Sequence, residues 1–136
     1  MARFVILRHD VSSGLDRTEH GHFDWMFEIG SALRTWATDV VAIDALQTWV
    51  DAAALADHRT AYLDFEGEIS GDRGRVSRVA LGTFELTENS SDRFDANLSW
   101  ADVGRDAVEN PVQRRLLIER LREEPSEGSW RLRLSG

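Results

Sequence analysis

Histidine and aspartate side chains at two places near the start of the chain have the types and spacing needed to bind a divalent metal ion. Residues 22–29 read HFDWMFEI, and the two-residue period of a β-strand would place His22 and Asp24 on one face and the aromatic residues on the other. Alternate residues on a strand face lie roughly 7 Å apart at Cα, close enough for both side chains to bind one ion. His9 follows the apolar segment FVIL at residues 4–7, so the end of a strand could present it to the same ion.

Two imidazoles and one carboxylate suit a hydrolytic transition metal. They leave coordination positions for water and a phosphate oxygen, and they suit Mn²⁺ or Zn²⁺ better than Mg²⁺ or Ca²⁺. His20 is a competing ligand, but it lies in the polar segment SSGLDRTEHG, and we expect it to face solvent. The sequence predicts a metal site of His9, His22 and Asp24. An ordinary half-buried strand with its polar side in water explains the His22–Asp24 pattern equally well.

A second candidate pair is His58 and Tyr62. If this segment is extended, the two side chains share a face and could donate hydrogen bonds to a phosphate, and His58 could protonate a leaving oxygen. A histidine beside Asp57 is more often a structural hydrogen-bond partner, and a lone tyrosine is more often part of a core. Spacing alone therefore favours a structural role for both residues.

The length and composition are those of a single domain without cysteine. The chain has 136 residues, 42% of them apolar, and we expect residues 1–136 to form a single domain. The absence of cysteine excludes disulfides, zinc ribbons and thiol nucleophiles. No apolar run approaches the roughly 20 residues that span a bilayer, and the first residues lack a signal-peptide pattern. We therefore expect a cytoplasmic protein with no membrane partner.

The charge balance argues against broad nucleic-acid binding. Asp plus Glu outnumber Lys plus Arg by 24 to 16, which gives a formal charge of -8, and every fixed positive charge is an arginine. A protein that relied on neutralising phosphates would be expected to carry a basic stripe. Two groups of arginines are the exceptions, and we interpret them as solvated faces: Arg73, Arg75 and Arg78, and Arg114, Arg115, Arg120 and Arg122.

Many short apolar segments separated by turn residues must position these side chains. We expect strands over residues 4–7, 23–29, 61–65, 75–81, 83–86, 96–100 and 130–134, with a turn at Gly82 among others. Residues 112–124, VQRRLLIERLREE, have the apolar spacing of a helix, with Asn110 as N-cap and Pro111 in the first turn. Residues 43–55 predict a weaker helix or, equally, a strand. The expected fold is all-β and mainly antiparallel: a small closed or nearly closed β-barrel with one or two flanking helices.

The chain resembles the 3'-phosphoesterase domain family of bacterial DNA ligase D. The segments that carry the resemblance are FVILRHD at 4–10, HFDWMFE at 22–28, LRTWA at 33–37, DHRTAYLDFEG at 57–67 and EGSWRLR at 127–133. They are similar, in the same order, to F-V-x-x-x-H-D, H-Y-D-F-R-L-E, L-x-S-W-A, D-H-x-x-x-Y-x-D-F-E-G and G-x-W-x-L-x-R. The resemblance covers most of the chain, and its specificity comes from the number and order of the segments.

The resemblance implies a compact β-barrel with a bound manganese ion that removes 3'-phosphates or 3'-ribonucleotides from DNA ends. It assigns the metal to His9, His22 and Asp24, and the phosphate contacts to His58 and Tyr62. Nucleic-acid 3' ends would then be the substrate. Any ligase or polymerase partner would be a separate polypeptide, since this chain carries no motif of either.

One departure from the family bears directly on activity. Met26 stands where the family has an arginine two residues after the metal aspartate, and methionine offers neither charge nor hydrogen-bond donors to a phosphate. We expect Arg34, Arg73 or Arg75 to replace it in an active enzyme, and Met26→Arg to raise the activity. The alternatives are a phosphoesterase with another substrate, and a weak or inactive metal-binding barrel that serves as a binding module in nucleic-acid repair.

Overall fold

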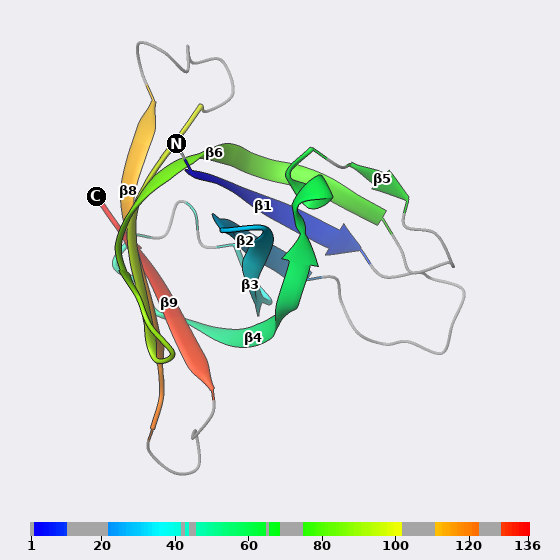
Figure 1. The fold of residues 1–136 in the computed structure, drawn as a ribbon. Helices are drawn as coiled ribbons and strands as arrows, with labels where there is room; N and C mark the ends of the chain where they lie inside the picture. Colours follow the sequence, from blue (N-terminus) through cyan, green and yellow to red (C-terminus); the bar gives the residue numbers. More distant parts are fainter. Residues whose placement is uncertain are drawn as a thin grey trace.

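The computed structural model describes residues 2–10, 22–41, 43, 46–64, 66–68, 75–101, 111–122 and 129–136 (Figure 1). Almost all regular structure in these residues is β-strand. The elements in chain order are β1 (Ala2–Asp10), β2 (His22–Ile29), β3 (Ala32–Thr38), β4 (Val50–Arg59), the 3-10 helix η1 (Thr60–Leu63), β5 (Gly67–Glu68), β6 (Arg75–Asn89), β7 (Arg93–Trp100), β8 (Val112–Arg120) and β9 (Trp130–Ser135). Among the described residues, no helix has the length and apolar character needed to cross a membrane.

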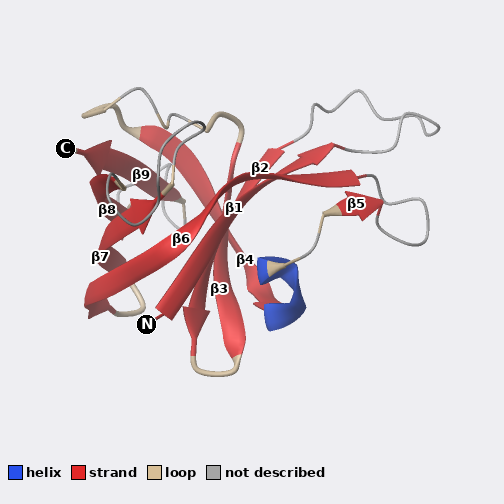
Figure 2. Ribbon diagram, turned by 90° about the horizontal axis from the view of Figure 1, so that it is seen from above, coloured by secondary structure: helices blue, strands red, loops and turns tan. Residues whose placement is uncertain are grey.

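Eight of these strands close into an antiparallel barrel, as the sequence predicts. Their order around the barrel is β1-β2-β3-β4-β9-β8-β7-β6, and β6 pairs back with β1. β5 pairs only with the outer edge of β6, so it lies beside the ring of strands (Figure 2). Closure leaves few exposed strand edges, which explains how so short a chain can hold an all-β fold.

β6 is one long strand that bends at Gly82. Its first part pairs with β1 and its second part pairs with β7, so Gly82 has both Phe4 and Trp100 as partners. A Cβ atom at Gly82 would come within 2.0 Å of the carbonyl oxygen of Ser99, so only glycine fits this close approach. The predicted turn at Gly82 is therefore wrong: the glycine bends a continuous strand around the corner of the barrel.

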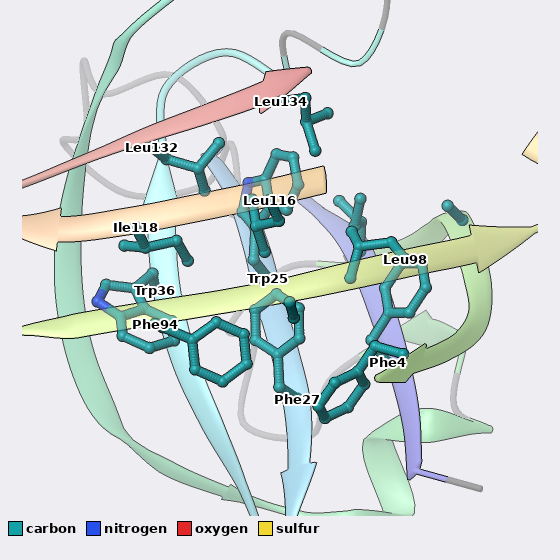
Figure 3. Packing of buried hydrophobic residues seen from close by; sticks show 14 of the residues in the cluster. Phe4, Trp25, Phe27, Trp36, Phe94, Leu98, Leu116, Ile118, Leu132 and Leu134 are labelled. Atoms are coloured by element: carbon teal, nitrogen blue, oxygen red, sulfur yellow. The ribbon is translucent and has the colours of Figure 1, made fainter. Parts of the chain in front are cut away.

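The barrel interior is filled by large aromatic and aliphatic side chains. Alternate residues of each strand point inward and pack on one another across the barrel (Figure 3). Phe27 lies at the centre, with its ring centroid 4.6 Å from that of Phe94 and 6.0 Å from that of Trp36. The indole N–H of Trp25 donates a hydrogen bond of 3.0 Å to Thr38 Oγ1, so this buried polar group has a partner. Burying each such side chain contributes about 1.5–3 kcal/mol.

A second, smaller apolar cluster lies on the outer face of the barrel wall. It consists of Val5, Leu7, Met26, Leu33, Leu63 and Val76, with Tyr62 and Leu81 packed at its edge. η1 supplies Leu63 and Tyr62 after the chain turns back from β4 toward β1, and Figure 2 shows this helix outside the ring of strands. β1 and β2 are therefore apolar on both faces here. The expectation that the second face of β2 simply meets water is wrong for this stretch.

The two predicted helices are the main errors in the element assignment. Residues 112–120 form β8, in which Val112, Leu116 and Ile118 point into the barrel, while residues 123–124 lie outside the described part. β4 occupies residues 50–59, so strand is the correct alternative for the end of the 43–55 segment. Residues 60–63 form η1 in place of the strand expected at 61–65, and β3 was not predicted. In the described residues, η1 is thus the only helix beside the barrel.

Candidate metal centre

β1 and β2 bring His9, His22 and Asp24 together on the outer face of the barrel. The two strands are antiparallel, with His9 directly opposite His22 and Leu7 opposite Asp24. Antiparallel pairing thus places His9 beside the His-x-Asp face of β2. One ligating atom from each of the three side chains lies within 4.8 Å of the others. These three residues are the set predicted from the sequence, whereas His20 lies outside the described residues.

The carboxylate of Asp24 is buried and lacks a normal hydrogen-bond shell. Its side chain is only 5% exposed, and His22 Nε2 lies 3.0 Å from Oδ1. This contact is short enough for a hydrogen bond, but the buried Oδ1 has no well-aligned donor among the described residues. His9 Nδ1 lies 4.0 Å from the other oxygen, Oδ2. A buried carboxylate oxygen without a donor is costly, and a bound cation would remove the cost.

The distances fit a small transition-metal ion. Nitrogen and oxygen ligands bind such ions at about 2.0–2.2 Å, so two ligands of one ion lie roughly 3 to 4.3 Å apart. His22 Nε2 lies 3.0 Å from Oδ1 and His9 Nδ1 lies 4.0 Å from Oδ2, both in that range, while one ligand atom from each of the three residues gives separations of up to 4.8 Å. The imidazole rings of His9 and His22 meet edge to face, with centroids 4.8 Å apart. Small rotations of these side chains would therefore bring one atom from each residue within bonding distance of a divalent ion.

The local electrostatics favour a positive charge at this position. The short polar contact with Asp24 raises the pKa of His22 above its ordinary value of 6.5, against the lowering effect of burial. Charge attraction to Asp24 and to Asp39 adds to the increase in the pKa. Asp24 thus attracts either a proton on His22 or a metal ion in its place.

His58 and Tyr62 form a separate pair on the same side of the barrel. Their ring centroids are 5.6 Å apart in an edge-to-face contact. His58 Nδ1 lies 2.9 Å from the carbonyl oxygen of Ala56 and can donate to it. With the Nδ1 proton held there, Nε2 is the nitrogen that can take up or release a proton. The two rings are in contact, as a shared face would require, but the segment is not extended throughout: His58 lies near the end of β4 and Tyr62 lies in η1.

The structure does not place His58 in the metal group. Leu33 pairs with Glu28 on one side and with His58 on the other. Glu28 follows Asp24 by four residues, roughly 13 Å along the strand. Tyr62 packs at the edge of the outer apolar cluster, which includes both Leu33, the partner of His58, and Leu7, the partner of Asp24.

Met26 is part of the outer apolar cluster and is 1% exposed. Arg34 cannot stand in for the family arginine, because it lies on the inner side of β3 with its guanidinium 4.6 Å from the ring centroid of Trp36. Desolvation by burial lowers the pKa of Arg34, which is consistent with that enclosed position. Arg75 lies on the opposite face of β6 from Val76, away from the site, and Arg73 lies outside the described residues.

Fold and site together define a small antiparallel β-barrel with a two-histidine, one-aspartate group on its outer wall. No family model matches the chain, and no curated protein matches it significantly. The resemblance to the DNA ligase D phosphoesterases thus rests on the ordered segments of the sequence.

Proposed function

We propose that this chain is a divalent-metal-dependent phosphoesterase that removes a 3'-phosphate or a 3'-ribonucleotide from DNA ends, with Mn²⁺ held by His9, His22 and Asp24. The observation that supports it most is the buried Asp24 oxygen that has no hydrogen-bond donor in the described residues and lies beside two histidines. Zn²⁺ is the alternative metal, because the same ligands suit it. A cytoplasmic location and a separate ligase or polymerase partner belong to this proposal.

The chain's own residues supply positioning and a proton. A bound metal would polarise a phosphoryl oxygen and lower the pKa of a coordinated water. Tyr62 contacts His58 and packs at the edge of the outer apolar cluster, and in this proposal its hydroxyl donates a hydrogen bond that orients the phosphate. For His58 to protonate a leaving 3' oxygen through Nε2, the substrate would have to extend from the metal across β3 to the end of β4, because His58 lies two strands and about four residues away from Asp24.

Two observations favour the alternative of a weak or inactive binding module. Met26 is buried among apolar side chains, so this position offers no charge to a phosphate. The formal charge of -8 also disfavours extended contact with DNA. An uncharged Met26 position and a net negative charge would both be compatible with a barrel that binds a metal and one nucleic-acid end, while a partner protein catalyses the reaction.

A time course with an end-labelled duplex tests the proposal. Wild type, Asp24→Ala and Glu85→Ala are incubated with Mn²⁺ and a primer-template that ends in a 3'-phosphate or a 3'-ribonucleotide. We expect slow removal by wild type and by Glu85→Ala, whose exposed carboxylate lies on the part of β6 that pairs with β7, and none by Asp24→Ala. If wild type binds Mn²⁺ and releases no product, the enzyme proposal fails and the binding module stands.

A further inference from the structure

Arg78 on β6 is the arginine that the outer face of the barrel places next to the metal group. β6 pairs with β1, with Arg78 opposite Leu7 and Val76 opposite His9. Leu7 and Val76 both belong to the outer apolar cluster, so Arg78 lies on the same face as the metal ligands. From the sequence alone, we interpret this arginine as part of a solvated face.

The register gives the reach of this side chain. Arg78, Leu7 and Asp24 stand opposite one another on three neighbouring strands, so Arg78 and Asp24 are roughly 10 Å apart at Cα. His9 is the diagonal neighbour of Arg78 across a single strand pair, a separation of roughly 7–8 Å that long side chains can span. A phosphate that lay between an ion at Asp24 and β6 would therefore be within reach of the guanidinium.

The present partner of Arg78 is a carboxylate that a ligand can replace. Glu66 Oε2 accepts a hydrogen bond of 2.8 Å from the backbone N–H of Arg78, which holds the carboxylate in place. The guanidinium lies 4.0 Å from Oε1, at the outer limit of an ion pair, and the side chains are 32% and 50% exposed. Such a partly exposed pair contributes little stability, so the guanidinium can turn to a stronger anion at small cost.

We infer that Arg78 and the metal together bind a terminal phosphate monoester, with the phosphate between the ion and the guanidinium. This inference rests on the proposed function, because it takes the ion at His9, His22 and Asp24 as given. The ion and the guanidinium would each bind oxygens of one phosphate, and a terminal monoester offers three free oxygens and two charges where a diester offers two free oxygens and a single charge. The site thus takes a 3'-phosphate in preference to an internal phosphodiester.

Calorimetry with inorganic phosphate as the ligand tests this role without any measurement of turnover. Each protein is first titrated with Mn²⁺ and then, in the loaded form, with phosphate. We expect Arg78→Gln to keep its Mn²⁺ affinity and to lose about ten- to a hundredfold in phosphate affinity, since it loses a charged hydrogen bond. Arg78→Lys keeps the charge without the planar fork and should fall in between. Arg75→Gln removes the same charge from the other face of β6 and should match wild type.

A second pair of variants separates ligand binding from a merely structural role. Glu66→Gln releases Arg78 from its present partner and should tighten phosphate binding. Asp64→Asn neutralises a carboxylate of the same chain segment that pairs with Arg3, and should leave the affinity unchanged. Unchanged phosphate affinity in Arg78→Gln with Mn²⁺ bound would overturn the role of Arg78 and leave the proposed function standing. Failure of wild type to bind Mn²⁺ would overturn the proposed function and this inference together.

Discussion

Asp24 and the two histidines beside it supply the first test at the scale of single residues. Each ligand contributes one donor to a three-ligand group, so removing one should weaken Mn²⁺ binding by at least about tenfold. We predict this loss for His22→Ala and full binding for His58→Ala, because His58 lies outside the group. Calorimetry on chelator-treated protein measures both. Equal affinities in wild type and His22→Ala would exclude His22 as a ligand.

The charge on His22 should make the metal-free and metal-bound proteins respond to pH in opposite ways. The pKa of His22 is raised above 6.5 in the folded chain. Its pairing with Asp24 therefore stabilises the metal-free fold fully below that value, and this contribution is lost as the pH rises through the folded pKa. Metal binding needs neutral imidazoles, so stabilisation by Mn²⁺ should grow over the same range.

Thermal unfolding of wild type and His22→Gln measures both trends. In chelator, wild type should exceed His22→Gln in Tm more at about pH 6 than at about pH 8. With Mn²⁺ present, the increase in the Tm of wild type should be larger at about pH 8 than at about pH 6. A metal-induced increase that is the same at both pH values would contradict coordination by histidine.

The position of Met26 changes what its substitution should do. The sequence alone suggests that Met26→Arg restores a phosphate contact. In the structure Met26 is 1% exposed and packs with Leu7 and Leu33, so arginine would bring a charge into an apolar cluster. We predict a loss on the order of 3 kcal/mol in the free energy of unfolding, against less than about 1.5 kcal/mol for Met26→Leu. Urea unfolding checks this, and a stable, more active Met26→Arg would show that the cluster opens easily.

At the scale of elements, the bend in β6 depends on the lack of a Cβ atom at Gly82. Gly82→Ala would drive a Cβ into the Ser99 carbonyl, which belongs to the paired strand and cannot move alone. We predict a cost of about 3 kcal/mol or more. Gly30→Ala is the matched control, because Gly30 has a φ of 62° with no atom within 4 Å of an added Cβ. Its cost should be only about 1–2 kcal/mol of backbone strain. Equal effects of the two substitutions in urea unfolding would contradict the close approach.

The comparison between β2 and β8 shows what the sequence could predict and why the rest could not be predicted. β2 alternates chemically, so its strand, its inward aromatic residues and the pairing of His22 with Asp24 follow from period two. β8 is rich in Arg, Gln, Glu and Leu, which favour a helix, and its strand form is set by pairing with β7 and β9. Long-range pairing also decides the role of Arg78, which no local pattern indicates.

At the scale of the whole molecule, most arginines on the wall formed by β7, β8 and β9 form ion pairs with carboxylates. Arg115 forms a two-pronged pair with the buried Asp95, with contacts of 2.7 and 3.1 Å. Arg93 lies within 4.0 Å of Glu88, Asp95 and Glu119. These pairs neutralise one another in place, so the local excess of arginine in the sequence does not produce a basic surface there.

The last prediction concerns how DNA should bind to a barrel of this charge. The proposed site offers the metal and Arg78 to one terminal phosphate, and the formal charge of -8 opposes further backbone contacts. Each neutralised phosphate contributes about -0.9 to the slope of log K against log salt concentration, so we expect a slope no steeper than about -2. Fluorescence anisotropy with a labelled duplex measures it, in Mn²⁺ and with His58→Ala, which removes the proposed proton donor and keeps the three metal ligands. A duplex that ends in a 3'-hydroxyl should bind at least about tenfold more weakly than one with a 3'-phosphate. It lacks the dianionic phosphate that the metal ion and Arg78 would bind. A slope of about -5 or steeper, with no preference for the 3'-phosphate, would instead show an extended interface along the duplex, and the end-specific site would have to be given up.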